Sequence, residues 1–153
     1  MIPQNRLARI AILLLAVLVL GGVDQWSKYW LGHWIVGQTW HWGPLRLILY
    51  RNPGIAFSIW LPMWLALILI IGLLIFLIFL WLTPRRSWLD GLGLLLVISG
   101  GVSNLWDKWQ LGYVRDFVSV GWLPVFNLAD VLIFIGIVII VWQAIYDRDQ
   151  QKV

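Results

Sequence analysis

The sequence predicts an all-α membrane protein of four transmembrane helices, with a small extracytoplasmic β/helical subdomain formed by the first outer loop. Hydrophobic residues make up 61% of the 153 residues and charged residues only 12%, whereas a soluble domain carries about 25% charged residues. Four apolar stretches each approach the roughly 20 residues that a helix needs to cross a bilayer. We therefore expect residues 1–153 to form a single integral membrane domain.

The predicted spans cover residues 7–23, 61–82, 88–105 and 129–146, with outer loops at 24–60 and 106–128. Arg6 and Arg9 before the first apolar stretch are also typical of a cleavable signal peptide. A retained helix is favoured, because no small-x-small cleavage site follows and the stretch leads directly into polar residues. We expect the Arg9 side chain to reach the membrane surface along its apolar stem. Glycines in the last three spans are predicted to permit close helix contacts; they are Gly72, Gly93, Gly100, Gly101 and Gly136.

Four spans place both termini on one side of the membrane. Six cationic residues lie in short segments on that side: Arg6, Arg9, Arg85, Arg86, Arg148 and Lys152. Five others are spread over the two long loops: Lys28, Arg46, Arg51, Lys108 and Arg115. The positive-inside rule gives most weight to short flanking segments. The termini and the turn at 83–86 are therefore predicted to be cytoplasmic, and the long loops to face outward.

The first outer loop is too long for a simple turn. Residues 45–51 partly alternate between apolar and polar and lie between Gly-Pro and Asn-Pro-Gly turn sequences, which predicts a short strand. The apolar residues 29–35 are predicted to form a helix lying on the membrane. Ten of the 13 Trp residues lie in or beside the two outer loops. Two interpretations stay open, an aromatic belt at the membrane interface or a loop surface that handles a lipid-like ligand.

Polar residues gather near the predicted outer ends of all four spans. They are Asp24, Lys28, Asn52, Gly54, Asn104, Asp107, Lys108, Asp116, Asn127 and Asp130. Each also has an ordinary structural explanation. Asp24 and Lys28 have the spacing of a helical ion pair, and Asn52 is typical of a turn. Asn127 can cap the last helix, with Asp130 favoured by the helix dipole.

Two further explanations of this kind concern the second outer loop. Asp107 and Lys108 can mark the point where the third helix leaves the membrane, and Arg115 can neutralise Asp116. Taken together, however, the polar residues converge on one membrane face, and the opposite face has no comparable cluster. Ionisable residues beside a bilayer are functional candidates by default. We therefore predict that these residues line one pocket.

Asp116 and Asp130 are the candidate catalytic residues. Peptide hydrolysis without a nucleophilic side chain or a metal needs a base that activates water and an acid that protonates the leaving nitrogen. Two neighbouring carboxylates with separated pKa values supply both, and Asn side chains can hold a carbonyl or a developing oxyanion. The chain has no Cys, which excludes thiolate chemistry and thiolate metal sites. His33 and His41 make no metal site by their spacing, the scattered cations make nucleic acid an improbable partner, and no cofactor is expected.

The polar motifs resemble those of lipoprotein signal peptidase (signal peptidase II), an aspartic peptidase of the bacterial inner membrane. The resemblance runs along nearly the whole chain, through Asp24-Gln25-Trp26-Ser27-Lys28, Asn52-Pro53-Gly54-Ile55-Ala56-Phe57-Ser58, Gly100-Gly101-Val102-Ser103-Asn104-Leu105-Trp106-Asp107-Lys108, Gly112-Tyr113-Val114-Arg115-Asp116-Phe117 and Phe126-Asn127-Leu128-Ala129-Asp130. It implies that Asp116 and Asp130 are the catalytic pair and that the other polar residues shape the site. It also implies a monomer that removes the signal peptide from diacylglyceryl-modified prolipoproteins just before the lipidated Cys.

Four positions depart from the family's usual pattern. Lys108 stands where Arg is common, Ser103 where Gly is usual, and Ile55 where a small residue is usual. Arg115 adds a charge beside Asp116, where the family is usually apolar. A lysine lacks the two-pronged geometry of a guanidinium, so these departures bear on the pocket more than on the reaction.

Two other functions fit the aspartates. In a small transporter or ion-coupled subunit they would relay protons or cations, but relay residues belong near the middle of a span and these lie at span ends. In a lipid-binding scaffold without catalysis, Asp→Asn substitutions would leave activity intact. For the peptidase, we expect Asp130 at a helix N-terminus to be the base and Asp116 to be the acid.

Overall fold

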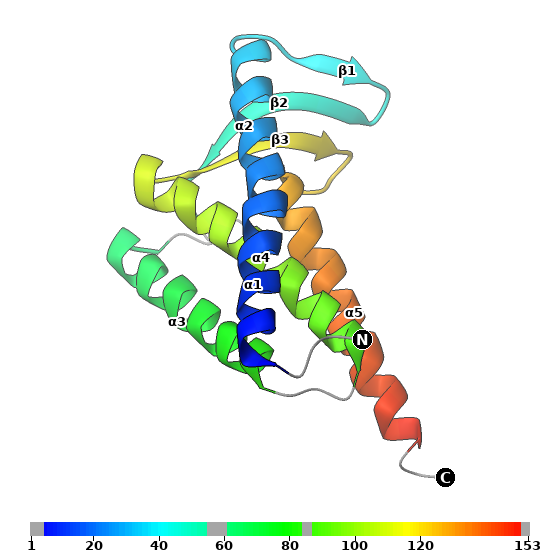
Figure 1. Cartoon of the computed structure of the whole chain (residues 1–153). Helices are drawn as coiled ribbons and strands as arrows, with labels where there is room; N and C mark the ends of the chain where they lie inside the picture. The colour runs from blue at the N-terminus through cyan, green and yellow to red at the C-terminus, as the bar shows by residue number, and fades with distance from the viewer. Residues whose placement is uncertain (1–4, 55–60, 84–86, 151–153) are drawn as a thin grey trace.

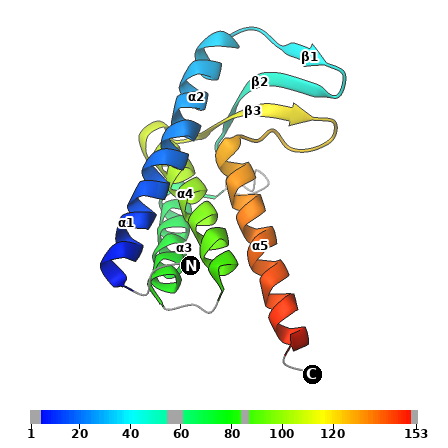
Figure 2. The ribbon, with the colours of Figure 1, turned by 45° about the vertical axis from the view of Figure 1, so that its right-hand side comes forward.

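The computed structural model describes residues 5–54, 61–83 and 87–150. It consists of four long helical segments and a three-stranded sheet at one end of the helices (Figure 1). All four segments are long and apolar enough to cross a membrane, which confirms the predicted fold class. The first segment begins and the last one ends at the end of the bundle opposite the sheet (Figures 1 and 2).

The first segment is one continuous helix rather than a span followed by a separate surface helix. It consists of α1 (Arg6–Ala16), a π-helical turn η1 (Val17–Gly21) and α2 (Gly22–Trp34). The predicted end near residue 23 was wrong, because the polar side chains of Asp24 and Lys28 are buried against other helices and do not mark an exit into water. The helix therefore carries its polar residues past the apolar stretch without a break.

The other three helices are α3 (Met63–Leu82), α4 (Trp88–Leu111) and α5 (Leu128–Gln150). They differ from their predicted spans at the outer end of α3 and α4 and mainly at the inner end of α5. The predicted end of the third span near residue 105 was too early, since α4 continues to Leu111 and ends at Gly112, whose φ of +82° suits a residue without a side chain. Asn104, Asp107 and Lys108 thus lie inside the last two turns of α4.

Glycine allows α4 and α5 to approach closely. A Cβ atom on Gly100 would lie 2.5 Å from the carbonyl oxygen of Ala129, and one on Gly136 would lie 2.6 Å from the carbonyl oxygen of Gly93. Gly101 instead faces Leu74 on α3. Gly72 was wrongly predicted to lie at a contact, because a Cβ there would meet nothing within 4 Å. The close α4–α5 contact places the first turn of α5 directly against the polar end of α4.

The inner ends of the first and second spans are joined by Arg9 and Trp81. Arg9 Nη1 donates to the carbonyl oxygens of Trp81 (2.8 Å) and Thr83 (2.6 Å), and Trp81 Nε1 donates to the carbonyl oxygen of Arg9 (3.0 Å). The position of Arg9 relative to the membrane surface stays a prediction, and in the structure its buried guanidinium supplies donors to carbonyls at the end of α3. Arg85, Arg86 and Lys152, which entered the orientation argument, lie outside the described residues.

The sheet has the order β1 (Trp40–Trp42), β2 (Leu45–Asn52) and β3 (Val114–Val120), with both pairs antiparallel. The strand predicted at 45–51 is confirmed as β2. The second outer loop contains β3, which was not predicted and which pairs Tyr50 with Asp116 and Asn52 with Val114. A register shift between Leu47 and Tyr50 separates the two halves of this pairing. The sheet therefore brings residues from both outer loops to one place above the helices.

Candidate active site

The predicted polar residues form two adjoining groups where α2, α4, α5, β2 and β3 meet. We call Asp24, Lys28, Asp107 and Arg115 the charged half. We call Asp116, Asp130, Asn52, Asn104 and Asn127 the amide half. The two halves differ in what their carboxylates contact, and that difference decides their chemistry.

Asp24 links three helices through its two carboxylate oxygens. Oδ2 lies 2.7 Å from Lys28 Nζ, as the spacing predicted, and also accepts from the Ser103 hydroxyl on α4 at 2.6 Å. Oδ1 accepts from the backbone N–H of Ala129 on α5 at 2.8 Å. Asp24 and Lys28 are at most 1% exposed. A buried carboxylate with these partners holds α2, α4 and α5 together.

Asp107 is the partner of Arg115. Arg115 Nη2 donates to Asp107 Oδ1 at 2.7 Å, while its Nε and its backbone N–H donate to Oδ2 at 3.2 and 3.0 Å. Lys28 Nζ lies 3.5 Å from the same carboxylate. The expectation that Arg115 neutralises Asp116 was therefore wrong. In a strand, neighbouring side chains point to opposite sides, and Arg115 points to α4 while Asp116 points to the amide half.

Asp116 accepts hydrogen bonds from two side-chain amides. Asn52 Nδ2 donates to Oδ2 at 3.0 Å, and Asn127 Nδ2 donates to Oδ1 at 2.6 Å. Asp116 is 1% exposed. Burial, together with the negative charge of Asp130, raises the pKa of the Asp116 carboxyl to about 7, although the two amide donors act in the opposite direction. This carboxyl is therefore able to hold a proton near neutral pH.

Asp130 lies at the start of α5, in the arrangement that its spacing from Asn127 predicted. Its backbone N–H donates to Asn127 Oδ1 at 2.9 Å, and its own Oδ2 accepts from the Asn127 backbone N–H at 3.1 Å. These reciprocal bonds are those of a capping box. Oδ1 accepts from Asn104 Nδ2 at 2.8 Å. The helix N-terminus and these donors offset part of the cost of burying the charged carboxylate.

Asn127 connects the two aspartates, because its side-chain amide reaches Asp116 while its backbone and side-chain oxygen hold Asp130. Asn104 joins the amide half to the charged half. Its Oδ1 accepts from Lys28 Nζ at 2.8 Å and from Asn127 Nδ2 at 3.2 Å. The two carboxylates are therefore close enough for the charge of Asp130 to raise the pKa of Asp116.

Lys108 holds the turn that follows β2. Its Nζ donates to the carbonyl oxygens of Pro53 and Gly54. The Gly54 N–H in turn donates to Asn52 Oδ1 at 3.0 Å, so Asn52 both makes the predicted turn and contacts Asp116. Lys108 is 2% exposed. Residues 55–58 of the motif that begins at Asn52 lie outside the described residues.

All ten predicted site residues lie in or directly beside these groups. Sequence reasoning missed the role of Gln25, whose Nε2 donates to Asp107 Oδ1 (2.9 Å) and whose Oε1 accepts from Arg115 Nη2 (2.7 Å). The sequence feature that could have indicated this role is its position directly after Asp24, in the same polar motif. Ser103 was treated as a mere departure, but it is the hydroxyl donor to Asp24. Within the described residues, no group of three His, Cys or acidic side chains is placed to hold a metal ion.

The fold and these polar groups define a class, a multi-pass membrane protein with a carboxylate pair at one end of its helices. Residues 14–146 match the family model described as signal peptidase (SPase) II, and the chain belongs to this family of aspartic peptidases. It is 33% identical to a lipoprotein signal peptidase of Moorella thermoacetica, over 91% of this chain and 95% of that protein. It is 37% identical to one of Bartonella henselae, over 91% of each.

A solved structure described as a bacterial membrane enzyme has the same fold. Its TM-score is 0.82 at 26% identity, and the match covers 92% of each chain. The four helices and these bacterial relatives make the chain a multi-pass protein of the bacterial inner membrane.

Proposed function

We propose that this protein removes the signal peptide from diacylglyceryl-modified prolipoproteins, cutting just before the lipidated Cys, with Asp116 and Asp130 as its catalytic residues. The observation that supports this most is the amide half. Two carboxylates, one on β3 and one in the first turn of α5, share contacts with Asn127, and in the described residues neither has a Lys or Arg within salt-bridge distance. An acid and a base are needed at one place, and paired cations would keep both carboxylates ionised.

In the proposed reaction, Asp130 takes a proton from water as the water oxygen adds to the scissile carbonyl. Asp116 then donates its proton to the leaving nitrogen as the C–N bond breaks. The products are a signal peptide with a free carboxyl group and a lipoprotein with a free amine on its lipidated Cys. The raised pKa of Asp116 supports its role as the acid. The helix N-terminus at Asp130 supports its role as the base.

Cleavage of a diacylglyceryl-modified prolipoprotein by the purified protein in detergent, followed by gel shift, tests this proposal. Asp116→Asn and Asp130→Asn are each expected to lower the rate at least about 10³-fold, because acid–base catalysis is lost. Asp147→Asn is the matched control, since the contact of Asp147 with Gln143 lies at the other end of α5. Near-normal turnover by either folded site variant would contradict the proposal.

We further propose that the termini are cytoplasmic, that the site faces outward and that the protein acts as a monomer. The distribution of Lys and Arg supports the orientation. Because the chain has no Cys, single introduced Cys residues can report its orientation in the membrane. In intact cells, a membrane-impermeant maleimide should label Trp122→Cys, at a position that is 91% exposed beside β3, but not Asn5→Cys. The reverse labelling pattern would invert the orientation.

A further inference from the structure

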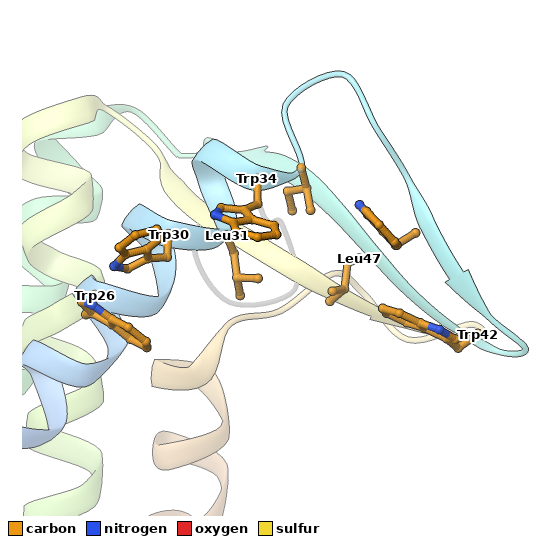
Figure 3. Close-up of a pocket in the computed structure, with 8 residues that line it drawn as sticks. Trp26, Trp30, Leu31, Trp34, Trp42 and Leu47 are labelled. Carbon is orange, nitrogen blue, oxygen red and sulfur yellow. The ribbon is translucent and has the colours of Figure 1, made fainter.

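An open groove of about 500 Å³ lies between α2 and the β1–β2 hairpin (Figure 3). It is lined almost entirely by apolar side chains: Trp26, Trp30, Leu31, Trp34, Ile35, Trp40, Trp42 and Leu47. Trp26 and Trp30 contact each other at a centroid distance of 6.2 Å, and Trp40 and Trp42 stack at 6.0 Å. We call this feature the tryptophan groove. The proposed chemistry at Asp116 and Asp130 does not use it.

The depth of the groove follows from the packing of the first two spans. Arg9 contacts the carbonyl oxygens of Trp81 and Thr83, which aligns the inner ends of α1 and α3. The 20 residues of α3 are about 30 Å long, the thickness of the hydrocarbon layer. Measured outward from Arg9, the same length of about 30 Å along the first helix ends near Lys28. Trp30 and Trp34 therefore lie just beyond the hydrocarbon, at the depth of the lipid headgroups.

The tryptophan groove continues the lipid-facing surface of the first span. Leu18 is 72% exposed and Val23 49% exposed on this helix, and the exposed apolar surface continues outward through Trp26 at 63% and Trp34 at 68%. Trp combines an apolar ring with a polar N–H and favours the boundary between hydrocarbon and headgroups. A lipid molecule at that boundary is therefore in direct contact with the groove.

The charge of the surrounding segment indicates which lipid fits. Residues 29–54 contain Arg46 and Arg51 but neither Asp nor Glu. Arg46 donates to the Ser119 hydroxyl, and Arg51 lies over the ring of Tyr113. Within the described part of the chain, neither guanidinium has a carboxylate at salt-bridge distance. Neither arginine lines the groove, but the segment that carries it is net positive and attracts an anionic headgroup beside the apolar lining.

We infer that the tryptophan groove binds an anionic phospholipid of the outer leaflet. The diacylglyceryl group of a substrate is the less suitable occupant. Its acyl chains must extend from the catalytic pair toward the bilayer centre, whereas all the groove residues except Trp26 follow Lys28 on its outward side. A phospholipid held there fixes the β1–β2 hairpin on the membrane surface, and β2 carries Asn52 at its end.

Native mass spectrometry of the full chain in detergent, titrated with dioleoylphosphatidylglycerol, tests this inference. The groove variant combines Trp30→Ala, Trp34→Ala and Trp42→Ala. The control variant combines Trp64→Ala, Trp88→Ala and Trp142→Ala, three residues with 64%, 59% and 69% exposure that do not line the groove. The groove variant should bind phosphatidylglycerol about tenfold more weakly than the native chain, and the control variant within about twofold of it.

Equal loss in both variants would overturn the inference, because it would show a general effect of removing aromatic rings. Equal binding of dioleoylphosphatidylcholine would remove the preference for an anionic headgroup. Displacement of the phospholipid by a diacylglyceryl-modified peptide would assign the groove to the substrate instead. If the triple variant does not fold, Trp34→Ala alone should weaken binding about threefold, and unchanged binding would overturn the inference.

Discussion

The charged half and the amide half contain two aspartates each and lie side by side, but their carboxylates have opposite surroundings. Asp24 and Asp107 each contact a cation at 2.7 Å. Asp116 and Asp130 instead accept hydrogen bonds from neutral amides and a backbone N–H. A cation keeps a buried carboxylate ionised, whereas Asp116, which is buried without a cation at salt-bridge distance and lies near the charge of Asp130, can hold a proton. The comparison indicates that one pair stabilises the fold and the other is available for proton transfer.

The largest expected effect on stability comes from Asp107→Asn. This substitution leaves Arg115 and Lys28 without their shared carboxylate in a buried site, which costs about 3–5 kcal/mol. Thermal unfolding in detergent should show a decrease in Tm of about 10 °C.

The effect of Asp116→Asn on Tm is the matched comparison for that of Asp107→Asn. The folded-state pKa of Asp116, about 7, lies above its ordinary value of 3.8. Its ionisation therefore opposes folding. The effect is absent below about pH 3.8, grows as pH rises, and is complete above about pH 7. At pH 8 this variant should lose much less Tm than Asp107→Asn. An equal loss would contradict the division into two halves.

A substitution at the contact between α4 and α5, which positions both halves, is expected to have the next largest effect on stability. Gly100→Ala places a Cβ atom 2.5 Å from the backbone oxygen of Ala129, so α5 must move away from α4. We expect a loss of about 1–3 kcal/mol of stability together with reduced cleavage. Gly72→Ala has open space around its Cβ and should change neither property, as thermal unfolding and the cleavage assay can both report.

The pH dependence of cleavage tests which aspartate of the amide half is the acid and which is the base. Because Asp116 must be protonated to act as the acid, kcat/KM should fall about tenfold per pH unit above about pH 7. Circular dichroism at each pH should confirm that the fold persists. A rate that rises through pH 7 would make Asp116 the base and reverse the assignment.

Lys108→Arg is expected to have the smallest effect. The guanidinium keeps the positive charge and can donate to both the Pro53 and Gly54 carbonyls that Lys108 Nζ contacts. We expect kcat and KM to stay within about threefold of the native values, a change of under about 1 kcal/mol. Lys108→Met removes the charge and both hydrogen bonds, and should weaken KM far more. Similar values for the two variants would show that the turn does not depend on these hydrogen bonds.

Hydropathy was sufficient to predict four spans, and alternation was sufficient to predict β2, because both patterns are local. The continuation of the first helix to Trp34 was not predictable in this way. Asp24, Gln25 and Lys28 look like a span end in sequence, but they pair with residues about 80 positions away on α4. β3 was missed because its partner is β2, in the other outer loop.

The candidate site was predicted better than its internal contacts. Residue types and motif order predicted that Asp116 and Asp130 lie in one polar cluster, and the local spacing of Asn127 and Asp130 predicted the N-cap of α5. The partner of Arg115 was not predictable, because it depends on which side of β3 faces α4. Alternation along a strand decides that side, and the strand itself was not foreseen.

The π-helical turn η1 has a consequence for which changes of chain length this protein tolerates. A π turn contains about one residue more than an α turn, and each residue rotates an α-helix by about 100°. Removing one residue from 17–21 and restoring α winding would keep Asp24 and Lys28 facing α4, because four residues of α-helix turn through about the same angle as five residues of this wider turn. The first helix is therefore expected to tolerate the loss of one residue in this turn, whereas the loss of a residue from the regular helix on either side would rotate the polar side of α2 by about 100° away from α4.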